Sequence, residues 1–216
     1  IMIAELTLAI QTCSEDGTNR YLCLSGMGKS FCAGADVGGM HRLASNTFEE
    51  NLVAARQLAD LFDILYRAPL PVIIQAKGNV FGGGIGLVAA ADIVLADEGT
   101  IFSLSEVKLG IIPAVISPYL IRVMGERQAK RYALTGEKFD TAQAYQLGLV
   151  HQVVTADTAT AVLESLQTTL LKGGPLAQRH IKRLFADLSG QPIGSKTHEM
   201  TARAIAEIRA SAEGKE

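Results

Sequence analysis

Three consecutive glycines, Gly82 to Gly84, constrain the fold of this chain more than any other feature of its sequence. They follow an apolar run, residues 72–76, that has the composition of a buried strand, and they precede a small-residue run, 87–91, with helical character. Glycines in series disfavour regular structure, so a glycine run at a strand-to-helix junction needs a physical reason. From the residues alone two readings are open. The helix packs closely on the strand, or a ligand closely approaches backbone N–H groups at the helix N-terminus.

Short apolar segments alternate with helical segments through the first two-thirds of the chain. The pattern predicts strands over residues 20–25, 72–76, 93–96 and 150–154. It predicts helices over 1–11, 47–66, 87–91, 126–134 and 140–148, and only helices from residue 158 onward, with one interruption at 190–194. This order indicates an α/β fold of parallel layers followed by a helical appendage, which we divide into residues 1–154 and 155–216.

Composition and charge exclude several classes of protein. A net charge of −2 gives no electrostatic footprint for nucleic acid or an anionic membrane. The longest apolar run, 84–96, is broken by Asp92 and is shorter than the roughly 20 residues that cross a bilayer. The chain opens on an amphipathic pattern without a basic stretch, so we expect no signal peptide and a cytoplasmic protein. Cys13, Cys23 and Cys32 lack metal-ligand spacing, which favours free thiols and no metal site.

Four segments carry a resemblance to a known family. They are SFCAGAD from Ser30, PVIIQAKGNVFGGGIGLVAAADIVLA from Pro71, FSLSEVKLGIIPAVISP from Phe102 and LTGEKFDTAQAYQLGLV from Leu134. In this order and spacing they resemble the crotonase family of enoyl-CoA hydratases and isomerases. The resemblance implies a crotonase-type spiral of ββα units, a C-terminal helical region that drives trimerisation, and often a hexamer. It also implies an acyl-CoA substrate and no cofactor, because coenzyme A is part of the substrate.

The same resemblance implies the residues of the active site. The backbone N–H groups of Ala35 and Gly83 would hold the thioester oxygen and stabilise an enolate, while Glu106 would exchange the proton at the α-carbon. The remaining motif positions would bind substrate: Cys32, Ala33, Gly34, Asp36, Gly82, Gly86 and Pro113. Contacts to the phosphates and adenine of coenzyme A are expected from strands before this sequence and a helix after it.

Glu106 also stands out without any resemblance. It lies in the apolar stretch 102–113, where Lys108 is the only other charged residue. Desolvation there should raise the pKa of its carboxyl toward a value useful for acid–base chemistry. The alternative is a surface carboxylate paired with Lys108.

A second acid is missing from the expected place. Hydratases of the family usually carry a glutamate two residues after the glycine run, and here that position is Gly86. We expect Asp97 and Glu98 to be solvated in a turn and Asp92 to form structural hydrogen bonds. His41 either orients water near the acyl pocket or is structural. A wider pocket beside Gly86 would suit a branched substrate.

The segment from Leu104 to Tyr132 looks most like a bacterial subgroup that hydrates branched, carboxylated thioesters such as 3-methylglutaconyl-CoA and isohexenylglutaconyl-CoA. We therefore expect an enoyl-CoA hydratase acting on a branched acyl chain, as in fatty-acid or branched-chain amino-acid catabolism. One alternative is an enoyl-CoA isomerase with Glu106 as its single acid/base. A second is a non-catalytic or RNA-binding trimer, against which the oxyanion motif and the absence of a basic patch both argue.

Overall fold

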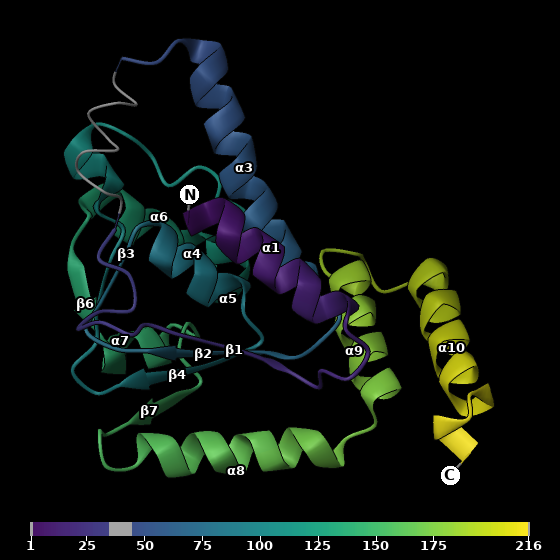
Figure 1. Cartoon of the computed structure of the whole chain (residues 1–216). Helices are drawn as coiled ribbons and strands as arrows, with labels where there is room; N and C mark the ends of the chain where they lie inside the picture. Colours follow the sequence, from purple (N-terminus) through teal and green to yellow (C-terminus); the bar gives the residue numbers. More distant parts are fainter. Residues whose placement is uncertain (1, 35–44, 216) are drawn as a thin grey trace.

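Two β-sheets organise the computed structural model, which describes residues 2–34 and 45–215 (Figure 1). The larger sheet is parallel and has the order β1–β2–β4–β7, and the smaller one has the order β3–β5–β6. The strands are β1 (Leu22–Ser25), β2 (Val72–Ala76), β3 (Asn79–Phe81), β4 (Ile93–Asp97), β5 (Ile101–Ser103), β6 (Lys138–Asp140) and β7 (Gln152–Val154). The α/β class with parallel strands is confirmed.

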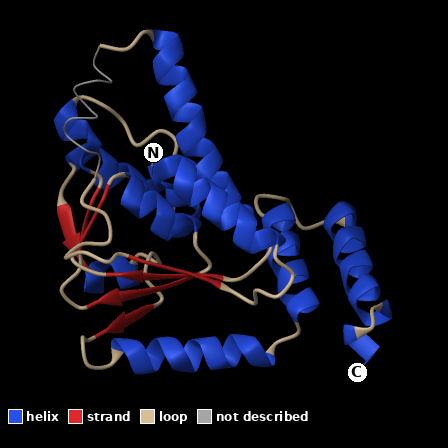
Figure 2. Cartoon of the chain, viewed as in Figure 1, coloured by secondary structure: helices blue, strands red, loops and turns tan. Residues whose placement is uncertain are grey.

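The chain alternates between the two sheets (Figure 2). After β1 and β2 in the larger sheet it crosses to the smaller one as β3, and it repeats the step from β4 to β5. Successive strands therefore stack in register, with Ile73 beside Ile93 in one sheet and Val80 beside Phe102 in the other. The result is a spiral of strand–strand–helix turns.

The smaller sheet was missed by the sequence analysis. Its three strands have three residues each, which is too short for a period-2 pattern to show. Strand β3 pairs with β5 in parallel, and β5 pairs with β6 in antiparallel. This sheet matters for function because Phe81, the last residue of β3, leads directly into the glycine run.

Two predicted helix starts are confirmed by their caps. The Thr47 N–H donates to Glu50 Oε2 at 2.7 Å, and the Glu50 N–H donates to Thr47 Oγ1 at 3.3 Å. Asp140 Oδ1 accepts from the Gln143 N–H at 2.8 Å. The helices are α1 (Met2–Glu15), α3 (Phe48–Arg67), α4 (Gly83–Ala90), α5 (Ser117–Met124), α6 (Glu126–Thr135), α7 (Thr141–Gln146), α8 (Ala159–Lys172), α9 (Pro175–Leu188) and α10 (Ser195–Ala210), with the 3₁₀ helices η1 (Ser105–Leu109) and η2 (Glu213–Lys215).

Helix α4 lies in the main hydrophobic core and packs against both α3 and α5. Six of its eight residues are buried, and five of the eight are glycine or alanine, which lets neighbours pack closely against it. The predicted helix of 87–91 therefore begins earlier, at Gly83, so that two glycines of the run are helical.

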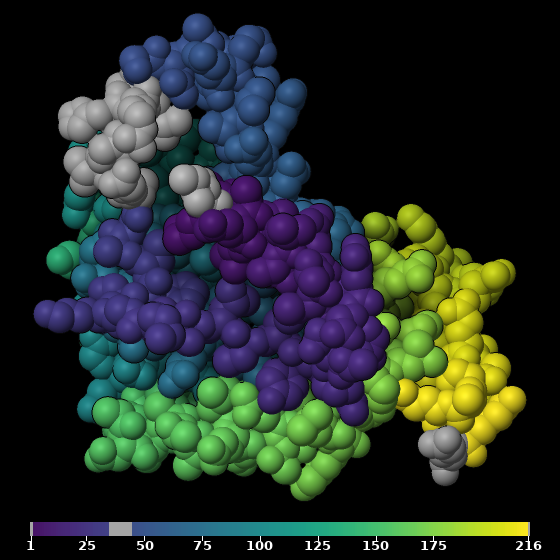
Figure 3. Space-filling view, viewed as in Figure 1, coloured from purple at the N-terminus to yellow at the C-terminus, as the bar shows by residue number. Residues whose placement is uncertain are grey.

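After Val154 the described chain is helical to its end (Figure 1). Helix α9 packs against α3, and α10 packs against α9 at the outer edge of the molecule, where it appears yellow in Figure 3. Glu213 holds this region together because its carboxylate accepts hydrogen bonds from the Leu176 and Ala177 N–H groups, at 2.9 and 2.8 Å. Within residues 2–34 and 45–215, no helix combines the length and apolar character needed to cross a bilayer.

Candidate active site

Each position in the run Gly82 to Gly84 is occupied by glycine for a different structural reason. Gly82 has φ 53°, a backbone conformation that residues with a side chain rarely adopt, and its N–H donates to the Ser103 carbonyl at 3.1 Å. Gly84 is packed against Cys32, whose Cβ would lie 2.6 Å from a Cβ at position 84. Close packing, one of the two readings from the sequence, is therefore confirmed at Gly84.

The second hypothesis from the sequence, that a ligand approaches a backbone N–H group at the helix N-terminus, fits Gly83. It is the first residue of α4, where the N–H has no carbonyl of its own helix to bind. Among the described residues no group accepts a hydrogen bond from it. A methyl group at position 83 would meet only Phe62 Cζ, at 3.8 Å, so the N-terminal end of α4 is not crowded on that side. The geometry suits a donor that points at a ligand oxygen, with the helix dipole favouring negative charge there.

Glu106 lies beside the same end of α4. A Cβ at position 82 would be 3.2 Å from Oε1 of Glu106, so the carboxylate rests against the Gly82 backbone. Its other oxygen, Oε2, is buried and has no hydrogen-bond partner within residues 2–34 and 45–215. Burial raises the pKa of the Glu106 carboxyl above its ordinary value of 4.5, and a hydrogen bond from its own backbone N–H lowers it in part. The desolvation predicted from the apolar stretch is confirmed.

The alternative role for Glu106 was a surface pair with Lys108. No ion pair joins these two residues in the part of the chain that the structure describes. The Lys108 side chain instead extends toward Gly136, where its Cε would lie 3.0 Å from a Cβ. Glu106 therefore keeps an unpaired, partly desolvated carboxylate, which is the state that acid–base chemistry needs.

The segment before the predicted first oxyanion donor lies along β3. Cys32 donates its N–H to the Asn79 carbonyl at 3.1 Å and accepts from the Phe81 N–H at 2.9 Å. Gly34 has φ 102° and lies next to the Phe81 side chain, while Ala33 is exposed. The chain from Cys32 to Gly34 thus runs toward the glycine run, as the predicted site requires. Ala35, Asp36 and His41 lie outside the described residues.

Gly86 differs from what the sequence suggested, whereas the predicted role of Pro113 stays a prediction. Gly86 is buried, and a Cβ there would overlap Ile116 Cγ2 and lie 2.8 Å from Phe62 Cε1. The expected wider pocket beside Gly86 is therefore wrong, because two hydrocarbon side chains fill that room. Pro113 is half-buried, and its carbonyl accepts from Ser117 Oγ at 2.7 Å at the start of α5. It belongs to the loop that connects η1 to Ile116.

Sequence reasoning did not single out Phe62 and Ile116. Both are ordinary apolar residues, Phe62 within α3 and Ile116 at the N-cap of α5, and no sequence signal distinguishes them from other core residues. Only the fold shows that they share one neighbour, Gly86, in the first turn of α4.

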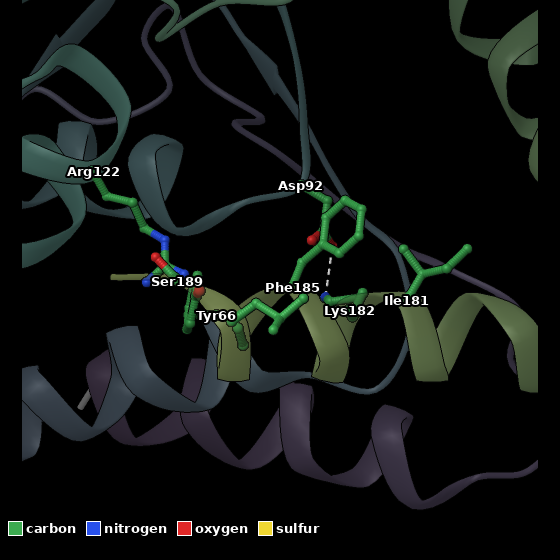
Figure 4. A pocket seen from close by; sticks show the side chains of 9 residues that line it. Tyr66, Asp92, Arg122, Ile181, Lys182, Phe185 and Ser189 are labelled. Atoms are coloured by element: carbon green, nitrogen blue, oxygen red, sulfur yellow. Dashed lines mark hydrogen bonds and ion pairs between the residues drawn. The ribbon is translucent and has the colours of Figure 1, made fainter. Parts of the chain in front are cut away.

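The expected structural role of Asp92 is confirmed. Asp92 Oδ2 accepts from the Val72 N–H at 2.7 Å and from Lys182 Nζ at 2.6 Å (Figure 4). Asp92 and Lys182 border a surface hollow of about 460 Å³ between α9 and the core, whose lining also includes Arg122 and Phe185. None of the predicted site residues that the structure describes lines this hollow.

The sequence and the fold both resemble those of known enoyl-CoA hydratases. The sequence profile described as enoyl-CoA hydratase/isomerase matches residues 1–215. An enoyl-CoA hydratase from Shewanella pealeana has a similar structure, with a TM-score of 0.96 and 40% identity over 100% of this chain and 80% of that one. AtuE from Pseudomonas aeruginosa has a TM-score of 0.94 and 33% identity, over 100% and 83%. Enoyl-CoA hydratase AKT6-1 of Alternaria alternata is 32% identical over 94% of this chain and 65% of its own length.

Proposed function

Because the chain belongs to the enoyl-CoA hydratase/isomerase family, also called the crotonase family, we propose that it adds water to the double bond of an α,β-unsaturated acyl-CoA. The observation that carries the proposal is the placement of Glu106. A partly desolvated carboxylate with a raised pKa lies against Gly82, the residue that precedes Gly83 at the N-terminal end of α4. The hydration named in the relatives needs both a proton carrier and an oxyanion donor.

In the proposed reaction the thioester oxygen accepts a hydrogen bond from the Gly83 N–H, and Ala35 is the proposed second donor. Glu106 takes a proton from the attacking water, whose oxygen bonds to the β-carbon. The double-bond electrons move onto the thioester as an enolate. The enolate collapses when Glu106 returns the proton to the α-carbon. One carboxylate is enough for this balance, and neither a metal nor a cofactor enters it.

The acyl chain is proposed to be branched, and its binding surface to include the apolar residues that follow Glu106. Leu109, Ile111 and Ile112 are exposed by 56%, 50% and 73%, which is unusual for three large aliphatic side chains in one loop. Cys32, Ala33, Gly34, Asp36, Gly82 and Pro113 stay proposed as substrate-binding residues. Gly86 is withdrawn from direct contact because its surroundings are filled.

Double-bond isomerisation is the second candidate, and one observation favours it. Hydrocarbon side chains occupy the room next to Gly86, so the described part of the site offers Glu106 as its single carboxylate. A single acid/base can move a proton from the γ-carbon to the α-carbon without adding water. No observation favours an RNA-binding role, given the net charge of −2.

We also propose a cytoplasmic homotrimer, or a hexamer of two trimers. The support is a set of exposed apolar side chains in the helical region: Leu171, Leu176, Ile181, Phe185 and Ile205. Such a concentration on α8 to α10 is typical of a surface that another chain covers.

One experiment tests the activity directly. The full-length protein is incubated in ¹⁸O-labelled water with crotonyl-CoA, 3-methylglutaconyl-CoA or a 3-enoyl-CoA, and the loss or gain of conjugation is followed. Hydration predicts loss of conjugation and one ¹⁸O atom in the product. Gain of conjugation from the 3-enoyl-CoA without label would show isomerisation instead. No change with any of the three thioesters would contradict both candidates.

A further inference from the structure

Position 86 is closed to every side chain by two neighbours. A methyl group there would overlap Ile116 Cγ2 and would lie 2.8 and 2.9 Å from Cε1 and Cζ of Phe62. Ile116 is 2% exposed and Phe62 is 1% exposed, so neither can turn into solvent to make room. Glycine is therefore the residue that fits at position 86 while Ile116 and Phe62 occupy the neighbouring space.

The space that Ile116 and Phe62 fill lies on the face of α4 that carries Gly83, the proposed oxyanion donor. Gly83 and Gly86 are three residues apart in α4 and so lie on one face of the helix. The Phe62 ring spans both of them, because Cζ is also the nearest atom to a Cβ at position 83. Glu106 approaches from the Gly82 side. The N-terminal end of α4 thus has a carboxylate on one side and two hydrocarbon side chains on the other.

We propose that Ile116 and Phe62 form an apolar wall that determines the chemistry of this site. The wall excludes water and any second acid from the Gly86 side, so that Glu106 both removes and returns the proton. This inference rests on the proposed function and deepens it, because it names the residues that limit the site to one acid/base. Ile116 is the main determinant, since its Cγ2 is the atom closest to the room above Gly86.

The steric part of the proposal predicts the sign of a small substitution. Alanine normally stabilises a helix interior relative to glycine, because glycine loses more backbone freedom on folding. We expect Gly86→Ala to lower the midpoint of thermal unfolding in the wild-type background, because its methyl group meets Ile116. In the Ile116→Ala background the same substitution should lower the midpoint less, because only the Phe62 ring still crowds the methyl group. Equal effects of Gly86→Ala in the two backgrounds would overturn the steric argument.

The chemical part is tested by opening the wall and supplying a second acid. We compare Ile116→Ala with the double variant Gly86→Glu/Ile116→Ala, measuring kcat for ¹⁸O incorporation into crotonyl-CoA. A positioned acid/base contributes on the order of 10²-fold or more, so we expect a gain of that order in the double variant. Leu120→Ala is the matched control, because Leu120 is equally buried one turn along α5. Its substitution should not change the reaction type.

The outcomes separate this inference from the proposed function. An active wild type with a folded double variant that adds water no faster than Ile116→Ala would overturn the wall and leave the proposed activity in place. A wild type that acts on none of the three thioesters would overturn the proposed function, and the chemical role of the wall with it. A purely structural role for Ile116 would lower the unfolding midpoint in both variants without any gain in water addition.

Discussion

The Glu106 carboxylate rests against the backbone of Gly82, with Oε1 3.2 Å from where a Cβ at that position would lie. The contact joins η1, which carries the only carboxylate proposed to react, to the residue that precedes the proposed oxyanion donor. Because the positive φ of Gly82 turns the chain into α4, the same glycine both starts the helix and leaves room for the acid.

Replacing Glu106 with glutamine should remove the proton carrier and leave the size of the side chain unchanged. We expect kcat to fall by about 10²–10⁴-fold with little change in KM, as for loss of a general acid/base. Glu98→Gln is the matched control, because Glu98 is exposed in the turn between β4 and β5. Near-full activity in the Glu106 variant would make this residue structural and leave His41 as the first alternative.

The same variant should show a pH-dependent gain in stability. The pKa of the Glu106 carboxyl is raised by burial, so the folded state holds this proton more tightly than the unfolded chain does. The stability that this group contributes is fully present below its ordinary pKa of 4.5 and is lost as pH rises through the raised folded value. We expect the unfolding midpoint of Glu106→Gln to exceed that of the wild type increasingly from pH 4 to pH 7. A constant difference across that range would exclude the desolvation argument.

Two substitutions at Gly83 separate its N–H from its shape. Gly83→Pro removes the donor, and proline is accepted at the first position of a helix, which Gly83 occupies. We expect kcat to fall by about 10²–10³-fold, as for loss of one oxyanion donor. Gly83→Ala keeps the N–H and has room for its methyl group, 3.8 Å from Phe62 Cζ, so it should retain most activity. Circular dichroism checks the fold, and a well-folded, active proline variant would rule out the donor role.

The Asp92–Lys182 pair should hold α9 on the core. Its side chains are 31% and 13% exposed, and Asp92 also accepts from the Val72 N–H. We expect Asp92→Ala to lower the free energy of unfolding by about 2 kcal/mol, because Lys182 and the Val72 N–H lose a charged partner. Asp187→Ala breaks an exposed pair with Arg183 and should cost less than about 0.5 kcal/mol. Similar costs in urea titrations of the two variants would contradict this difference.

Assembly is tested by light scattering at micromolar concentration. The full-length protein should have the mass of a trimer or of a dimer of trimers, with apolar faces in residues 158–171 and 200–208 covered. Ile205→Asp places a charge on an exposed apolar position of α10 and should lower that mass. Glu207→Lys, a charge change on the same helix, should leave it unchanged. A monomeric wild type would contradict the proposed assembly.

The sequence by itself determined those parts of the structure that depend on neighbouring residues. The caps at Thr47 and Asp140 follow from side chains that reach a backbone N–H three residues on. The two central strands of the larger sheet, β2 and β4, follow from apolar runs that are buried on both faces. The desolvation of Glu106 followed from the apolar stretch around it, and the motifs around the glycine run identified the family.

Tertiary structure decided what fills the space between distant segments. The three-residue strands of the smaller sheet form because partners in the spiral align them, and no local pattern marks them. Asp92 finds Lys182 at a separation of 90 residues. From the sequence, Gly86 predicted a wider pocket, whereas the fold brings Phe62 of α3 and Ile116, the residue before α5, onto it. Periodicity reports which face of an element is buried, but the side chain that occupies a given volume is set by packing in three dimensions.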